Sequence, residues 1–135
     1  MKIKNKAKYI LIALIVTSIF FFTCTLNMAD SESFNITVGS SAIKTGEKFA
    51  IIVTGMNITN LYAYEINLTF DEGLLSLVDV VSNIEGYSIP TQVKGNRIKF
   101  AMTKVGDKPP ESGNLTLCTL TFEAKATGTS AVTLN

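Results

Sequence analysis

Asp71 and Glu72 come closer to a catalytic pair than any other residues of this 135-residue sequence. Two carboxyl groups can run glycoside hydrolysis when they face each other across a cleft. Here the acids are adjacent and Gly73 follows, a combination typical of a solvated turn. The sequence has no histidine, the usual general base and a common metal ligand. We therefore predict that the protein is not an enzyme and has no catalytic or cofactor-binding residues.

Metal and thiol chemistry are equally unsupported. Asp107 lies among turn residues, but neither it nor the other acids form the dense ladder of oxygen ligands that an EF-hand uses. We expect no metal site. After residue 29 the one cysteine is Cys118, which alternates with Leu120 and Phe122. This pattern favours a small buried apolar residue over a reactive thiol, and no intramolecular disulfide can form.

The first 29 residues have the organisation of an export signal. Lysines at positions 2, 4, 6 and 8 precede an apolar run over residues 9–22. Its length of about fourteen residues suits the helix of a signal peptide better than a membrane span, which needs about twenty. We predict a signal peptide over 1–29 and a secreted or cell-surface protein. The alternative is an uncleaved membrane anchor over residues 9–25.

The remainder, residues 30–135, is long enough for one domain. It carries eight Lys/Arg against eleven Asp/Glu, a net charge of −3. A mildly acidic domain offers no electrostatic attraction for phosphate backbones, so we expect no nucleic-acid partner.

Beyond residue 33, apolar and polar residues alternate with a period of two, which predicts an all-β fold. The predicted strands cover residues 34–38, 47–56, 61–70, 74–81, an edge strand within 84–93, 97–102, 115–126 and 130–134. Turns or loops are predicted at 57–60, 94–96 and 106–114. Short strands with regular turn signals are typical of a β-sandwich.

Two of these strands predict a polar surface. In the segment 61–70, Tyr62, Tyr64, Ile66, Leu68 and Phe70 share the inward phase. The outward candidates for a binding surface are Glu65 and Asn67 on this segment and Arg97 and Lys99 on 97–102. This face shows no clear aromatic or aliphatic anchor, and Tyr87 is expected in a loop.

Several segments occur in an order that resembles the cohesin domain. They are Thr45-Gly46-Glu47, residues 61–71, 95–101, 113–115 and 120–126, and Thr127-Gly128-Thr129-Ser130. Cohesins are the sandwich modules that capture dockerin-bearing enzymes in cellulosomes. The resemblance implies a jelly-roll β-sandwich over residues 34–135, with an outward sheet face that binds a helical, calcium-loaded dockerin. It also implies that Glu65, just before Ile66, contacts the dockerin. Asn67 and Arg97 are included in the binding surface only as neighbours of Glu65.

The resemblance further implies one more strand after 130–134. We therefore expect that the last strand is missing and that the sequence is a fragment, or else that 34–38 lies along an open sheet edge.

The functional prediction is a non-catalytic extracellular module that docks dockerin-bearing enzymes in a polysaccharide-degrading assembly. Two alternatives remain: a carbohydrate-binding module that binds polysaccharide directly, and a surface-adhesin sandwich. Sugar binding would need exposed aromatic rings, and the sequence has no tryptophan.

Overall fold

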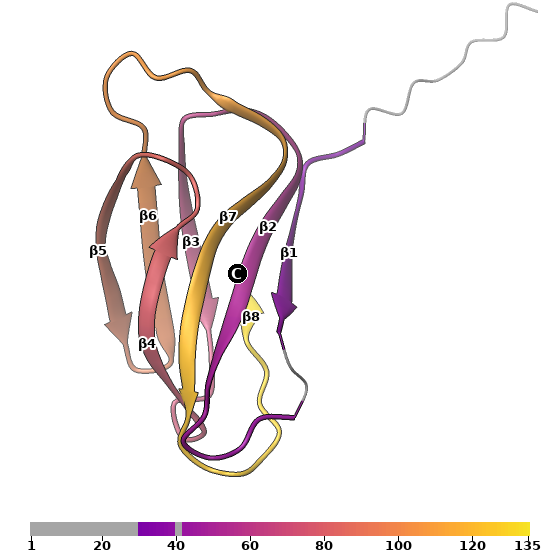
Figure 1. Ribbon diagram of the computed structural model, residues 1–135, viewed down its shortest axis with the longest axis vertical. Helices are drawn as coiled ribbons and strands as arrows, with labels where there is room; N and C mark the ends of the chain where they lie inside the picture. Colours follow the sequence, from indigo (N-terminus) through magenta and orange to yellow (C-terminus); the bar gives the residue numbers. More distant parts are fainter. Residues whose placement is uncertain (1–29, 40–41) are drawn as a thin grey trace, which may run out of the picture.

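The computed structural model describes residues 30–39 and 42–135, which form two packed antiparallel sheets (Figure 1). The strands are β1 (Ser33–Val38), β2 (Lys48–Leu61), β3 (Ala63–Thr69), β4 (Leu75–Ser82), β5 (Tyr87–Lys94), β6 (Arg97–Thr103), β7 (Glu111–Ala124) and β8 (Thr133–Leu134). The first sheet has the order β1-β2-β7-β4 and the second the order β5-β6-β3-β8. The predicted all-β sandwich is confirmed.

The described residues contain no helix, and so none that could cross a membrane. The predicted signal-peptide helix over 1–29 and the alternative anchor over 9–25 lie outside the described residues.

The core lies between the two sheets and centres on Phe122 of β7. Its side chain is fully buried, and its ring centroid lies 6.0 Å from that of Phe49 and 5.5 Å from that of Phe70. On β3, Ile66 and Leu68 point into the same core, as predicted. Because apolar residues recur at every second position, strands β2, β3, β6 and β7 bury one side and leave the other closer to solvent, whereas the edge strands β1 and β5 contain no fully buried residue.

The polar stretch 57–60 is part of β2, so the prediction of a turn there is wrong. Asn57 and Asn60 adopt left-handed conformations (φ 56° and 53°), which asparagine tolerates better than most residues. Their backbone N–H groups donate to Asn114 Oδ1 and to Ser112 Oγ, each over 3.0 Å. These side chains replace strand-to-strand hydrogen bonds at two bulges, and β2 therefore continues to Leu61.

Strand β7 begins at Glu111 and not at residue 115, so the predicted loop 106–114 is too long. A register shift between β2 and β7 turns both Leu117 and Cys118 inward. Burial raises the pKa of the Cys118 thiol to about 12. The prediction that Cys118 is a buried apolar residue is confirmed.

The sheet edges are β1 and β4 in the first sheet and β5 and β8 in the second. Among the described strands, β1 pairs only with β2, and Figure 1 shows β1 and β8 on the same side of the sandwich. Strand β5 is the edge strand predicted within 84–93, but it extends to Lys94, which was predicted to belong to the turn. Its pairing with β6 is interrupted between Ile89 and Gln92, where Pro90 lies.

Candidate functional site

The candidate site is the solvent-facing side of the second sheet, here called the outer face. Strand β6 alternates buried Ile98, Phe100 and Met102 with outward residues, and the register of β5 and β3 against β6 fixes which of their side chains share the outward side. The outer face consists of Tyr87, Ile89, Gln92 and Lys94 on β5, Arg97, Lys99, Ala101 and Thr103 on β6, and Ala63, Glu65, Asn67 and Thr69 on β3.

The structure brings three of the four predicted binding residues into one polar network. Lys99 Nζ lies 2.8 Å from Glu65 Oε2, and Asn67 Nδ2 donates to Glu65 Oε1 over 3.1 Å. Asn67 lies directly opposite Lys99 across the strand pair. Arg97, the fourth, shares the outward side, opposite Thr69. All four predicted residues therefore lie on the same outward side of β3 and β6, as expected. That they bind a partner stays a prediction.

The network is solvated. The side chains of Lys99 and Glu65 remain 50% and 46% exposed, so water screens the ion pair and its contribution to stability is small. The hydrogen bonds from Lys99 and then Asn67 hold the pKa of Glu65 below its usual value. Glu65 is therefore charged at neutral pH and presents a fixed acceptor on the outer face.

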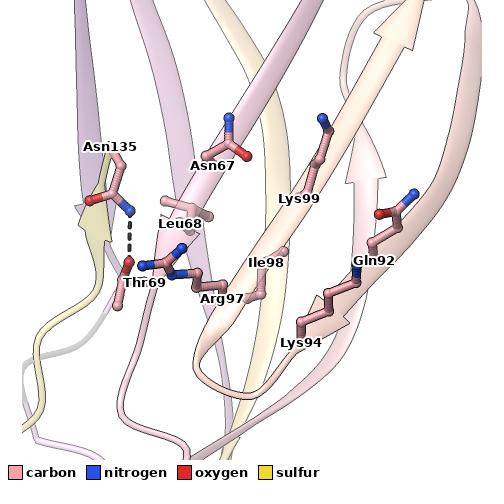
Figure 2. Close-up of a pocket in the computed structure, with 9 residues that line it drawn as sticks. All are labelled: Asn67, Leu68, Thr69, Gln92, Lys94, Arg97, Ile98, Lys99 and Asn135. Carbon is pink, nitrogen blue, oxygen red and sulfur yellow. Dashed lines mark hydrogen bonds between the residues drawn. The ribbon is translucent and has the colours of Figure 1, made fainter.

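A hollow of about 650 Å³ lies across the strands beside this network. Figure 2 shows the side chains that line it. The hollow is lined by Asn67, Leu68, Thr69, Gln92, Lys94, Arg97, Ile98, Lys99 and Asn135. Asn135 follows β8 and fixes one border: its Nδ2 donates to Thr69 Oγ1 over 2.7 Å, and its backbone N–H donates to the Asn67 carbonyl over 2.9 Å. Apart from Asn135, the polar atoms of this hollow come from β5, β6 and β3, and its charged side chains are all basic.

The outer face also has an apolar end that the sequence reading missed. Tyr87 is the first residue of β5, not part of a loop, and lies opposite Thr103; Ile89 lies opposite Ala101. Tyr87 is 61% exposed and Ile89 47% exposed. The outward residues of β3 and β6 include no large apolar side chain, as expected, and the apolar residues of this face come from β5. The alternation of Tyr87 and Ile89 was the available signal, but Gly86 and Pro90 obscured it.

The two tyrosines predicted to point inward from segment 61–70, Tyr62 and Tyr64, differ in orientation. Tyr64 points inward as predicted: its hydroxyl donates to the Leu117 carbonyl over 2.6 Å and lies 3.0 Å from Ser82 Oγ. Burial raises the pKa of Tyr64 to about 12. Tyr62 was predicted to point inward and is 55% exposed, because it lies at the bend between β2 and β3 where the strand alternation is broken.

The adjacent acids belong to a turn. Asp71 Oδ1 accepts the Gly73 N–H over 2.9 Å, and the Asp71 carbonyl accepts those of Leu74 and Leu75. Glu72 is exposed, and its carbonyl accepts Lys125 Nζ over 2.8 Å. Within residues 30–39 and 42–135, no group of three or more His, Cys, Asp or Glu side chains could hold a metal ion.

A two-sheet sandwich whose exposed sheet face combines an apolar end with a polar network is the architecture of a binding module. The family model of the cohesin domain matches residues 34–135, and the chain belongs to this family. No curated protein matches the sequence.

Solved structures give the same fold. A type II cohesin–X–dockerin complex from Acetivibrio cellulolyticus matches with a TM-score of 0.65 at 16% identity, over 77% of each chain. A non-cellulosomal cohesin from Archaeoglobus fulgidus matches with 0.60 at 21% identity, over 76% of this chain and 74% of that one. The sixth cohesin of scaffoldin B from A. cellulolyticus, in complex with a Cel5 dockerin, matches with 0.60 at 14% identity, over 76% and 82%.

Proposed function

We propose that this protein is a non-catalytic docking module that captures a dockerin-bearing enzyme through the outer face of the second sheet. The observation that carries the proposal is the outer face of a cohesin-family domain that offers an apolar anchor, Tyr87 with Ile89, beside the Glu65–Lys99–Asn67 network. Protein interfaces combine a few aromatic or aliphatic anchors with polar groups that set orientation.

One comparison and one prediction from the sequence further support this function. Two of the similar structures, from A. cellulolyticus, are complexes of cohesins with dockerins. The leader predicted over 1–29 would deliver the domain outside the cell, where an assembly that degrades polysaccharide must work. The module would then act by surface complementarity alone and perform no step of the hydrolysis itself.

A second candidate function is direct glycan binding. Tyr62 and Tyr87, expected in the core and in a loop, are both exposed. Ala63 and Tyr87 both lie opposite Thr103, so the two tyrosines flank the end of β6. Exposed aromatic rings with nearby polar groups are the surface that sugar rings stack on. Retention on a polysaccharide column in the absence of any dockerin would favour this function.

The test is binding of the protein to purified dockerin domains from the same genome, with calcium and after EDTA treatment. We expect capture of at least one dockerin with calcium and none with EDTA, because calcium organises the dockerin. Failure to bind any of them would overturn the proposal.

Glu65→Lys should abolish capture, because it replaces the acceptor of the network with a cation facing Lys99. The melting temperature should stay nearly unchanged, since the side chain is exposed. The matched control is Glu123→Lys on the outward side of the first sheet, opposite Lys48, which should keep full capture.

A further inference from the structure

Two cations of the outer face lie directly opposite each other. The register of β5 and β6 pairs Lys94 with Arg97, one residue on each side of the tight turn at Gly95 and Asn96. Like charges in directly opposed positions destabilise a strand pair. In the described part of the chain neither side chain has a carboxylate partner within salt-bridge distance. This end of the sheet therefore carries two positive charges that no salt bridge among the described residues neutralises, and the carboxylate of Glu72 lies beside Gly95 of the turn between them.

The neighbouring cation, Lys99, differs from Lys94 and Arg97 because it forms a salt bridge. Lys99 is already held by Glu65 at 2.8 Å and contributes little free positive charge. The hollow in Figure 2 opens between these groups, with Lys94 and Gln92 on one side and Arg97 on the other. An acceptor placed in the hollow could contact both Lys94 and Arg97, neither of which forms a salt bridge within the described residues.

The outer face is thus polarised along the strands. Its apolar end is formed by Tyr87 and Ile89 beside the small side chain of Ala101, and its basic end by Lys94 and Arg97. Ala101 and Arg97 are four residues apart on β6, or about 13 Å along an extended strand. A helix laid along the strand covers this length in a little over two turns, or roughly nine residues.

We propose that the basic end of the outer face receives acidic side chains of the docked partner. Resting on the dockerin function proposed above, this inference specifies the chemistry of the partner helix. The helix carries an apolar side chain over Ala101, between Tyr87 and Ile89, and aspartate or glutamate about two turns away against Lys94 and Arg97. Partners with neutral or basic residues at that position are rejected, because the two cations would stay unpaired and lose water.

The distinguishing measurement is the dissociation constant of each captured dockerin at about 50 and about 500 mM NaCl, because exposed charge pairs weaken when salt screens them. The variant Lys94→Gln/Arg97→Gln removes the two cations. The control Lys44→Gln/Lys48→Gln removes the same charge from the loop before β2 and from the start of β2 itself, away from the outer face. Both proteins are checked for an unchanged fold by thermal melting.

We expect the first variant to weaken dockerin binding roughly tenfold or more at low salt and to flatten the salt dependence, while the control binds like the unaltered protein. Dockerin binding that is equally tight and equally salt-dependent in the first variant would overturn this inference and leave the docking function intact. Absence of binding by every dockerin would overturn both. Retention on polygalacturonate that the first variant loses, without dockerin binding, would assign the cations to an acidic glycan and also overturn the inference.

Discussion

The outward sides of the two sheets differ in which charged residues lie opposite each other across neighbouring strands. In the first sheet, Lys48 on β2 lies opposite Glu123 on β7, so unlike charges face each other. In the second sheet, Lys94 lies opposite Arg97, so like charges do. Cross-strand pairs of unlike charge stabilise a sheet and pairs of like charge destabilise it. The first arrangement favours the folded sheet, whereas the second disfavours it unless another molecule supplies a negative charge.

The apolar residues follow the same contrast. On the outward side of the first sheet, Val81 of the edge strand β4 lies opposite Thr119 and is exposed; Val78, at the bulge of the same strand, is also exposed but is separated from it by Asp79 and Val80. On the outer face of the second sheet, Tyr87 and Ile89 stand side by side along β5. Single exposed apolar residues are ordinary, whereas a contiguous group next to polar residues marks an interaction site.

The largest effect is expected in the interior that both sheets share. Phe122→Ala should lower the free energy of unfolding by about 3–5 kcal/mol, because it removes a buried ring packed against Phe49 and Phe70. Thr121→Ala, next to it but outward, should have a far smaller effect. Urea denaturation measures both, and a neutral Phe122→Ala would mean that the inward phase of β7 is wrong.

The apolar end of the outer face supplies the next largest effect. Tyr87→Ala should weaken dockerin binding by about 1.4 kcal/mol or more, a tenfold change, since exposed aromatic anchors dominate interfaces. Val81→Ala removes an exposed apolar side chain from the other sheet and should leave affinity unchanged. Titration calorimetry measures the dockerin affinity of both variants. Equal losses of affinity would contradict the assignment of the binding surface to the second sheet.

The polar network predicts a pH effect at Glu65. Its folded-state pKa is lowered, chiefly by the hydrogen bond from Lys99. The stabilisation is thus present above the ordinary carboxyl range and is lost as the pH falls through the lowered value. Carboxyl NMR titration should find this pKa below 4.5, and Lys99→Ala should raise it. An unshifted carboxyl in the unaltered protein would show that the ion pair does not persist in solution.

The smallest effect separates the two charge pairs. At low salt, Lys94→Gln should raise the melting temperature slightly by relieving repulsion with Arg97, whereas Lys48→Gln should lower it slightly by removing the positive charge opposite Glu123. High salt should abolish both changes. Calorimetric melts compare them, and shifts of the same sign would contradict the contrast between the sheets.

Most of the fold could be predicted because alternation reports burial directly. Residues 63–70 and 97–102 have the predicted phase, since a strand with one buried side requires an apolar residue at every second position. The errors occur where alternation is interrupted. Asn57 and Asn60 were read as turn residues, and the side-chain hydrogen bonds from Ser112 and Asn114 that carry β2 through this stretch depend on strand pairing that no local pattern reports.

The candidate site was predictable only in part, for the same reason. Glu65, Asn67, Arg97 and Lys99 fall on strands with clean alternation, and their common face followed from it. Tyr87 and Ile89 belong to an edge strand interrupted by Pro90, and their position on this face depends on the register with β6. The position of Lys94 opposite Arg97 likewise depends on the register between β5 and β6. The polar half of the face was thus found without the anchor beside it.

The central claim is that the partner docks on the outer face of the second sheet. Amide chemical-shift mapping of the isotope-labelled protein with a captured dockerin and calcium tests it most directly. The largest shifts are expected along β5, β6 and β3, with Tyr87, Ile89, Arg97 and Lys99 among them and with β2 and β7 little changed. Shifts concentrated on β2 and β7, with β5 and β6 unperturbed, would contradict it.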